Sequence, residues 1–172
     1  NLTLTNINGL CRIALDKLKK TYEQDIQEKN IRIIFDNLTL SLMMEVNVEQ
    51  FSKVLAGILK NSMYALLKKS ETVTFSPEIF LGLKVNKDML EITIRDNGSG
   101  IDENIKDKIF APFFTTKTTG EAAGVGLYLC REIVQNHRGT IEVESKKGEY
   151  TQFLITIPVY QPKTITPPKE EE

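Results

Sequence analysis

The sequence has the length and composition of one soluble globular domain. Its 172 residues are 41% hydrophobic and 26% charged, with a formal net charge of −1, and a chain of this length can bury a sizeable core. A near-neutral charge with dispersed basic residues excludes nucleic acid or an anionic membrane surface as the expected main partner. The apolar stretches are too short for a bilayer span, and the first residues lack the features of a signal peptide. We therefore expect a cytoplasmic protein, and the start at Asn1 instead of Met suggests a piece of a longer one.

The first half of the chain alternates between helical and β-like patterns. Apolar residues at spacings of three and four predict one amphipathic helix over residues 5–29. Two short β-rich runs, 31–36 and 40–44, precede a second amphipathic helix over 48–68. Alternating residues then predict a β-hairpin whose strands are 78–86 and 89–96.

The second half begins with a segment that has no clear period. Residues 104–124 are rich in small and polar residues around the aromatic cluster 109–114, which suggests a lid with aromatic anchors. Helical spacing resumes over 124–137, and Gly139 suits a left-handed helix end.

Two strands are predicted to close the domain, at 140–145 and 150–158. We expect residues 1–36 to belong to the same domain as 37–160, and the Pro-, Lys- and Glu-rich residues 161–172 to be a disordered tail. Because helices and strands do not alternate strictly, the fold class expected is a two-layer α/β sandwich, a mixed sheet with helices on one face.

Two cysteines and one sharp bend are the first candidates for chemistry. Cys11 and Cys130 lie on apolar helix faces, which favours packing over a disulfide or a metal site. Residues 96–100, Asp-Asn-Gly-Ser-Gly, end a predicted strand at a bend that glycine permits. A flat ligand could approach the glycines while the carboxylate of Asp96 accepts a hydrogen bond from it, although a simple turn explains the pentapeptide equally well.

Two further segments could serve a nucleotide. Asn61 lies on a helix flank beside the predicted core, where an amide oxygen could complete the shell of Mg²⁺, or could be an ordinary surface asparagine. Residues 120–127 run from small residues and glycines directly into a helix start, which favours phosphate, and Lys117 could add positive charge. The glycine spacing fits neither a P-loop nor a dinucleotide fold.

In this order, the three segments resemble the ATP-binding domain of sensor histidine kinases, within the superfamily of DNA gyrase, mismatch-repair ATPases and heat-shock chaperones. Residues 55–62 resemble its N box, 96–101 its G1 box, 109–117 its F box with the following lid, and 123–127 its G2 box. The resemblance covers roughly residues 45–158 and implies an α/β sandwich with helices over one face of a mixed sheet.

The resemblance implies a role for individual residues. Asn61 would ligate Mg²⁺, Asp96 would bind the adenine amino group, and Lys117 and Asn61 would assist phosphoryl transfer. Gly98 and Gly100 would let the base approach, and the second glycine box would meet the phosphates. The full set assigned to Mg-ATP is Asn61, Ser62, Ala65, Asp96, Gly98, Gly100, Ile101, Phe114, Thr115, Thr116, Lys117, Gly124, Val125, Gly126, Leu127 and Thr151.

Departures from the family pattern bear on activity. Gly57 stands where hydrolytic relatives carry a glutamate that orients water, so slow hydrolysis is expected. Tyr64 replaces a frequent lysine, and Ala122-Ala123 replace a frequent Gly-Thr, which predicts fewer phosphate contacts. His137, the single histidine, is expected to pack or to cap a helix, because the family's acceptor histidine lies on an upstream hairpin.

The resemblance predicts a protein histidine kinase half that binds ATP and does not autophosphorylate alone. Its implied partners are a dimerisation and histidine-phosphotransfer domain and a response regulator, with no nucleic acid and no direct membrane contact by this domain. The longer protein could carry an inner-membrane anchor. Two alternatives stay open: a serine kinase of the same superfamily, of anti-sigma type, and a degenerate module that binds nucleotide without transferring phosphate.

Overall fold

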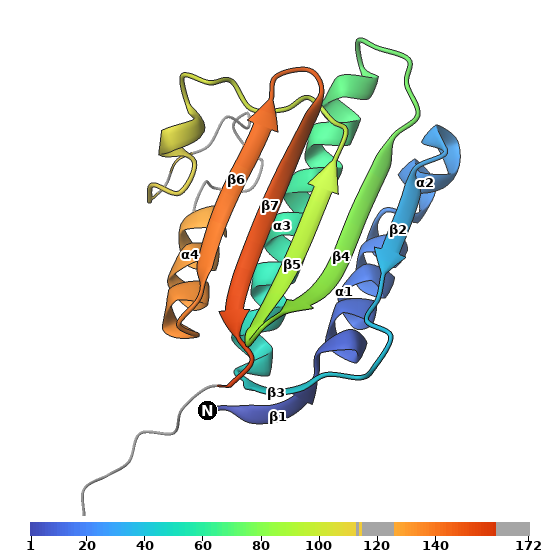
Figure 1. The fold of residues 1–172 in the computed structure, drawn as a ribbon. Helices are drawn as coiled ribbons and strands as arrows, with labels where there is room; N and C mark the ends of the chain where they lie inside the picture. Colours follow the sequence, from blue (N-terminus) through green and yellow to red (C-terminus); the bar gives the residue numbers. More distant parts are fainter. Residues whose placement is uncertain (113, 115–125, 161–172) are drawn as a thin grey trace, which may run out of the picture.

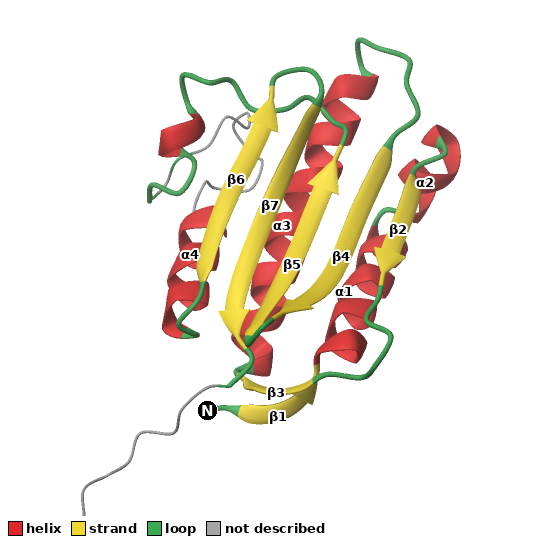
Figure 2. Cartoon of the chain, in the orientation of Figure 1, coloured by secondary structure: helices red, strands yellow, loops and turns green. Residues whose placement is uncertain are grey.

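The computed structural model describes residues 1–112, 114 and 126–160. A five-stranded mixed sheet in the order β2-β4-β5-β7-β6 lies in front of the three longer helices (Figure 1). Strand β2 runs parallel to β4, and every other neighbouring pair in this sheet is antiparallel. The expected two-layer α/β sandwich with a mixed sheet is confirmed (Figure 2).

The bounds of the elements agree closely with the predicted pattern in the second half of the chain. The helices are α1 (Ile7–Thr21), α2 (Glu23–Lys29), α3 (Val48–Ser70), η1 (Lys106–Lys108) and α4 (Gly126–Asn136). The strands are β1 (Thr3–Asn6), β2 (Arg32–Asp36), β3 (Met43–Val46), β4 (Glu78–Asn86), β5 (Met89–Asp96), β6 (Thr140–Lys146) and β7 (Tyr150–Pro158).

The prediction of one helix over residues 5–29 is wrong. Asn6 ends strand β1 and caps α1, its side chain accepting a hydrogen bond from Gly9 N at 3.1 Å. The helical run then breaks at Tyr22, where the backbone turns to φ −110° and ψ 26°. The preceding Thr21 donates its hydroxyl hydrogen to Lys17 O at 2.9 Å, a back-bonding contact that bends helices.

A small second sheet was not expected. Strand β1 pairs with β3 antiparallel, and β3 lies two to three residues later than the run predicted at 40–44. Asn8 holds the connection, since its Oδ1 accepts from Leu42 N at 3.1 Å. Pairing with β1 therefore selects residues 43–46, a choice that the local apolar pattern does not encode.

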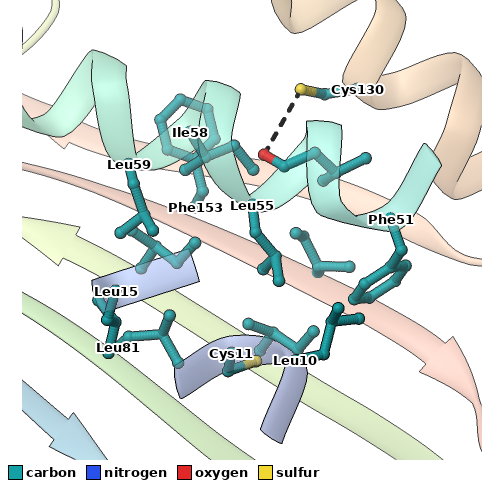
Figure 3. Close-up of a cluster of buried hydrophobic side chains, with 14 of the residues drawn as sticks. Leu10, Cys11, Leu15, Phe51, Leu55, Ile58, Leu59, Leu81, Cys130 and Phe153 are labelled. Carbon is teal, nitrogen blue, oxygen red and sulfur yellow. Dashed lines mark hydrogen bonds between the residues drawn. The ribbon is translucent and has the colours of Figure 1, made fainter. Parts of the chain in front are cut away.

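The core lies between the helices and the inner face of the sheet. Leu10 and Leu15 of α1, Leu55 of α3, and Leu81 and Phe153 of the sheet belong to one cluster of buried side chains (Figure 3). Cys11 and Cys130 are both buried and free, as predicted for packing residues. Among the described residues, no helix has the length and apolarity to cross a membrane.

The end of α4 is built differently from the prediction. Arg138, not Gly139, has the left-handed backbone, with φ 60°. Gly139 is needed for space instead, because a Cβ there would lie 2.4 Å from Thr156 O of β7. The predicted tail at 161–172 lies outside the described residues.

Candidate nucleotide-binding site

Asp96 lies buried at the end of β5, in the middle of the sheet. Its neighbours across the ladder are Ile79 of β4 and Thr151 of β7. Only 2% of Asp96 is exposed, and its Oδ1 accepts a hydrogen bond from Gly98 N at 2.9 Å. The alternating pattern of β5 places this carboxyl on the helix-covered face, so the strand delivers an acidic group to the interior.

The burial changes the acidity of Asp96. Loss of hydration raises the pKa of the carboxyl to about 7, against the lowering effects of Gly98 N–H, the Ser62 hydroxyl, Lys69 and Arg95. Near neutral pH, the group therefore exists in both protonation states. A ligand that donates a hydrogen bond would favour the ionised state.

The Ser62 hydroxyl is a second buried polar group beside Asp96. Ser62 is 1% exposed on the inner side of α3, and its Oγ makes no hydrogen bond of ordinary geometry with any described residue. The hydroxyl acts on the Asp96 carboxyl, whose pKa it lowers, but a buried hydroxyl without a well-formed hydrogen bond still costs free energy that a ligand can recover. Asp96, Ser62 and the buried Thr151 hydroxyl thus offer polar groups that fit the edge of a nucleotide base.

The glycines of the bend are needed by the protein itself. A Cβ on Gly98 would lie 2.5 Å from the carbonyl carbon of Ala65, and Ser99 N donates to Ala65 O at 3.1 Å. Gly100 has φ +67°, and a Cβ there would lie 2.2 Å from Lys146 O. The predicted role of these glycines towards a base is untested. Their first effect is to seat the bend between α3 and the β6–β7 turn.

Asn97, between Asp96 and Gly98, anchors the bend to β4. Its Oδ1 accepts from Glu78 N at 2.7 Å, and its Nδ2 donates to Ser76 O at 2.8 Å. Lys69 of α3 donates to Asn97 O at 2.9 Å. The hydrogen bonds of Asn97 therefore fix the backbone directly after Asp96 to β4 and α3.

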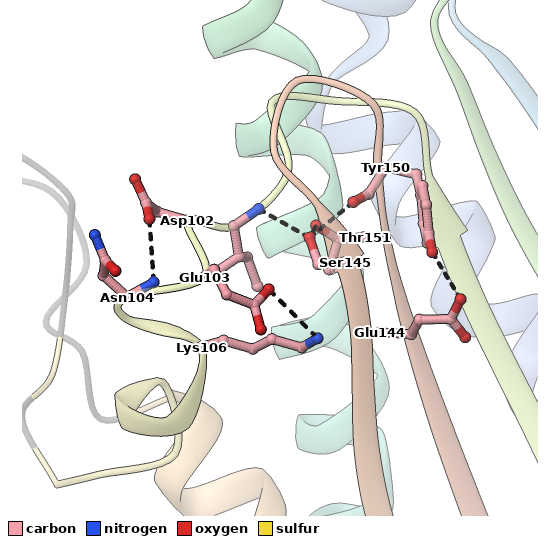
Figure 4. Close-up of polar contacts among 9 residues, drawn as sticks. Asp102, Glu103, Asn104, Lys106, Glu144, Ser145, Tyr150 and Thr151 are labelled. Carbon is pink, nitrogen blue, oxygen red and sulfur yellow. Dashed lines mark hydrogen bonds and ion pairs between the residues drawn. The ribbon is translucent and has the colours of Figure 1, made fainter.

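Ser145 is a site residue that the sequence prediction missed. Its Oγ accepts from Ile101 N at 2.8 Å, lies 3.0 Å from Thr151 Oγ1, and donates to Tyr150 O at 2.8 Å (Figure 4). It joins the bend to the strand that carries Thr151. The signal was available, because β6 alternates and a serine stands at its last inward position after Ile141 and Val143.

Replacing Ser145 with alanine should destabilise the fold by about 1–3 kcal/mol, because Ile101 N loses its acceptor in a partly buried position. ATP binding should weaken a few-fold as the bend loosens. Tyr150→Phe is the matched control, since it removes only the exposed bond to Glu144 of 2.6 Å and should cost at most about 0.5 kcal/mol. Chemical unfolding measures both, and equal stability of the two variants would contradict this role.

Only some of the remaining predicted site residues lie in the described part of the chain. Asn61 is half-buried on α3, one turn before Ala65, and Ile101, Phe114 and Leu127 are half-buried. Gly126 is the exposed first residue of α4. Thr115, Thr116, Lys117, Gly124, Val125 and the Ala122-Ala123 departure lie outside the described residues.

A magnesium site of protein ligands alone is not present in the part of the chain that is described. There, no three His, Cys, Asp or Glu side chains gather to hold a metal ion. A Mg²⁺ ion that takes most of its ligands from phosphates and water would need few protein ligands, and Asn61 on the flank of α3 stays the predicted source of one neutral oxygen.

Gly57, the departure expected to slow hydrolysis, has a packing role. A Cβ there would lie 3.2 Å from Sγ of Cys130 on α4, and Cys130 donates to Val54 O at 3.8 Å (Figure 3). The small residue lets α4 approach α3 closely. A glutamate at this position would have to displace that contact.

His137 is a structural residue, as predicted. It is 2% exposed, its Nε2 accepts from Asn47 N at 3.1 Å, and its Nδ1 donates to Ile133 O at 2.8 Å. The ring also meets Phe51 edge-on, at 5.8 Å between centroids. The contact with Asn47 ties α4 to the N-cap of α3, and both ring nitrogens are engaged.

A helix-backed mixed sheet with a buried carboxyl at the end of a central strand, beside a buried hydroxyl, is the architecture of an α/β nucleotide-binding domain. Residues 47–161 match the family model described as histidine kinase-, DNA gyrase B-, and HSP90-like ATPase. The chain belongs to this family, and the resemblance drawn from its sequence motifs is confirmed.

Curated proteins with similar sequences include sensor histidine kinases. The chain is 35% identical over 149 residues to cyanobacterial phytochrome A of Nostoc sp., covering 85% of this chain and 18% of that protein. It is 28% identical over 158 residues to the sensor histidine kinase ZraS of Salmonella typhi, covering 92% and 31%. The chain thus spans less than a third of the length of these relatives.

The structure of the catalytic domain of histidine kinase ThkA, in a nucleotide-free form, superposes with a TM-score of 0.75 at 28% identity. The match covers 93% of this chain and 97% of that one. The present chain is therefore an ATP-binding domain of the histidine-kinase kind.

Proposed function

We propose that this chain binds Mg-ATP and donates the γ-phosphoryl group to a histidine on a dimerisation domain of a longer sensor kinase, with a response regulator as the onward partner. The observation that carries the proposal is the buried Asp96 carboxyl beside Ser62 and Thr151. An ionised Asp96 would accept a hydrogen bond from the adenine amino group, and the Ser62 hydroxyl, which lacks a well-formed hydrogen bond, would gain one at the same site.

The residues of this chain would position the nucleotide, and no strong base is required. In the transfer, the bond between the γ-phosphorus and its bridging oxygen breaks, a nitrogen–phosphorus bond forms, ADP leaves, and the imidazole loses its proton to solvent. A bound Mg²⁺ would neutralise charge on the phosphates, with Asn61 as its protein ligand. Positioning and charge neutralisation would then account for the rate.

His137 is not an acceptor in this proposal. Its two ring nitrogens bond to Asn47 and Ile133, and the ring is 2% exposed. The chain by itself is therefore expected to bind nucleotide without becoming phosphorylated.

The test is calorimetric titration of the purified chain with ATP in the presence of Mg²⁺ or of a chelator. We expect binding that weakens on chelation, and no labelled phosphate on the chain after incubation with γ-labelled ATP. A histidine-bearing dimerisation domain is then added. An acid-labile phosphoryl group on it supports the proposal, an acid-stable one indicates a serine kinase, and absence of binding at millimolar ATP would refute nucleotide binding altogether.

A further inference from the structure

The outer edge of β2 is an open border of the main sheet. Among the described strands, β2 stands at one end of the strand order and has β4 as its single neighbour (Figures 1 and 2). Arg32 N donates to Pro77 O at 2.9 Å, which directs the backbone groups of Arg32, Ile34 and Asp36 towards β4. Because successive residues of a strand point their backbone groups to opposite sides, those of Ile33 and Phe35 face outward.

The centre of this edge, between the exposed Arg32 and Asp36, lacks the charged residues found along the opposite border. Strand β6, the other outermost strand, carries exposed Glu142 and Glu144 among its residues. In β2, the three central residues are apolar and half-buried, and neither lysine nor proline interrupts them. Natural sheets usually guard an edge with such residues, so an unguarded one is a candidate pairing surface.

We propose that the β2 edge pairs antiparallel with β2 of a second copy of this chain, about a two-fold axis at Ile34. The sequence of the strand, Arg-Ile-Ile-Phe-Asp, is self-complementary in that arrangement. Arg32 of each copy lies opposite Asp36 of the other, and Ile33 lies opposite Phe35. This inference does not rest on the proposed function.

The outward backbone groups select this register. Hydrogen-bonded antiparallel pairs must join Ile33 or Phe35 of one copy to an outward-facing residue of the other. Centring on Ile34 pairs Ile33 with Phe35 twice, so four backbone hydrogen bonds form. A two-fold axis at Ile33 would instead place Arg32 of one copy opposite Ile34 of the other, and an axis at Phe35 would place Asp36 opposite Ile34. Both registers lose the pairing of Arg32 with Asp36.

The side chains support the same register on both faces. Arg32, Ile34 and Asp36 share one face, and their pairs are of the non-hydrogen-bonded kind, in which side chains come closest. The two Arg32–Asp36 pairs therefore bracket an Ile34–Ile34 contact. On the helix-covered face, Ile33 meets Phe35, a β-branched and aromatic pair that stabilises sheets.

Charge inversion with reconstitution tests the proposal. Arg32→Asp leaves two acidic ends on the strand, and Asp36→Arg leaves two basic ends, so each variant should repel its own copies. Mixed together, the two variants again place opposite charges against each other at both ends. Sedimentation at low ionic strength, up to about 1 mM chain, should show a dimer for the parent and a heterodimer for the mixture. Each variant alone should associate more weakly than the parent, by about tenfold or more.

Glu142→Lys on β6 is the matched control and should dimerise as the parent does. Thermal melts establish that each variant folds. A parent that stays monomeric throughout the concentration range overturns the proposal, and so does a mixture that associates no better than its components. Pairing of the edge with a foreign extended peptide, while the parent stays monomeric, would also overturn it.

A disulfide tests the register independently. Ile34→Cys places two thiols at the two-fold axis, in a pair whose Cα atoms lie about 4.5 Å apart, within the range a disulfide spans. Mild oxidation should give a covalent dimer, since Cys11 and Cys130 are buried and do not compete. Glu142→Cys should remain monomeric under the same conditions. Equal cross-linking of the two variants would contradict the β2 register.

Discussion

Asp96→Asn should weaken ATP binding by roughly 10- to 100-fold while the fold stays intact. The change preserves size and the acceptor for Gly98 N, whose bond to Asp96 is 2.9 Å. It removes the negative charge that would meet the adenine amino group, and hydrogen bonds to charged groups contribute about 1.5–3 kcal/mol. Asp88→Asn, in the exposed turn at the other end of β5, is the control and should bind as the parent does.

The same variant should be more stable than the parent above pH 7. Burial raises the pKa of Asp96 from 3.8 to about 7, so the folded chain holds a proton that the unfolded chain releases between these values. The protonated Asp96 side chain therefore makes its whole contribution to stability below pH 4, and this contribution is lost as the pH rises to 7. At pH 8 the free energy of unfolding of the variant should exceed that of the parent by on the order of 2–4 kcal/mol. At pH 4 the two should be equally stable.

Nucleotide affinity should depend on pH with the opposite sign. Because adenine would bind the ionised carboxylate, affinity should fall about tenfold from pH 8 to pH 6 in the parent, as Asp96 gains its proton. In Asp96→Asn, the remaining pH dependence of nucleotide affinity should come from titration of the ATP phosphates alone. Calorimetry and chemical unfolding across this range measure both effects. A parent and variant with the same pH profile would show that Asp96 does not contact the nucleotide.

Gly98→Ala should destabilise the chain by at least about 2 kcal/mol and disrupt nucleotide binding. The added Cβ would lie 2.5 Å from the carbonyl carbon of Ala65 and 2.7 Å from its oxygen. Backbone atoms of α3 cannot rotate away, so the bend must move and the bond from Ser99 N to Ala65 O is strained or lost. The carboxyl of Asp96, two residues earlier, would shift with it.

Gly126→Ala is the matched control for this prediction. A Cβ on Gly126 would meet no atom of the described residues within 4 Å, and this residue begins α4. Because alanine favours helix more than glycine does, this variant should keep or raise stability. Thermal unfolding compares the two variants. If Gly98→Ala melted at the temperature of the parent, the close packing of the bend on α3 would be contradicted.

Local patterns predicted most of the secondary structure. The bounds of β4, β5 and β7 were predicted as they stand. In β5 and β7 one face is buried and the other is less so, which gives an alternating pattern, whereas β4 has three consecutive buried residues at 81–83. The break at Tyr22 and the pairing of β1 with β3 escaped prediction. Both depend on contacts of single residues, Thr21 with Lys17 and Asn8 with Leu42, that leave no periodic trace.

For the site, the sequence by itself determined which family the chain belongs to and predicted which residues would carry the chemistry, because motif order and residue type are local properties of the chain. The tertiary structure decided what those residues do for one another. Only folding brings Ser62 of α3, Asp96 of β5 and Thr151 of β7 together, and only burial raises the pKa of Asp96. The glycines of the bend were expected to leave room for a nucleotide base. In the structure they leave room for the backbone of α3 and of the β6–β7 turn, which are distant in the sequence and come close only in the folded chain.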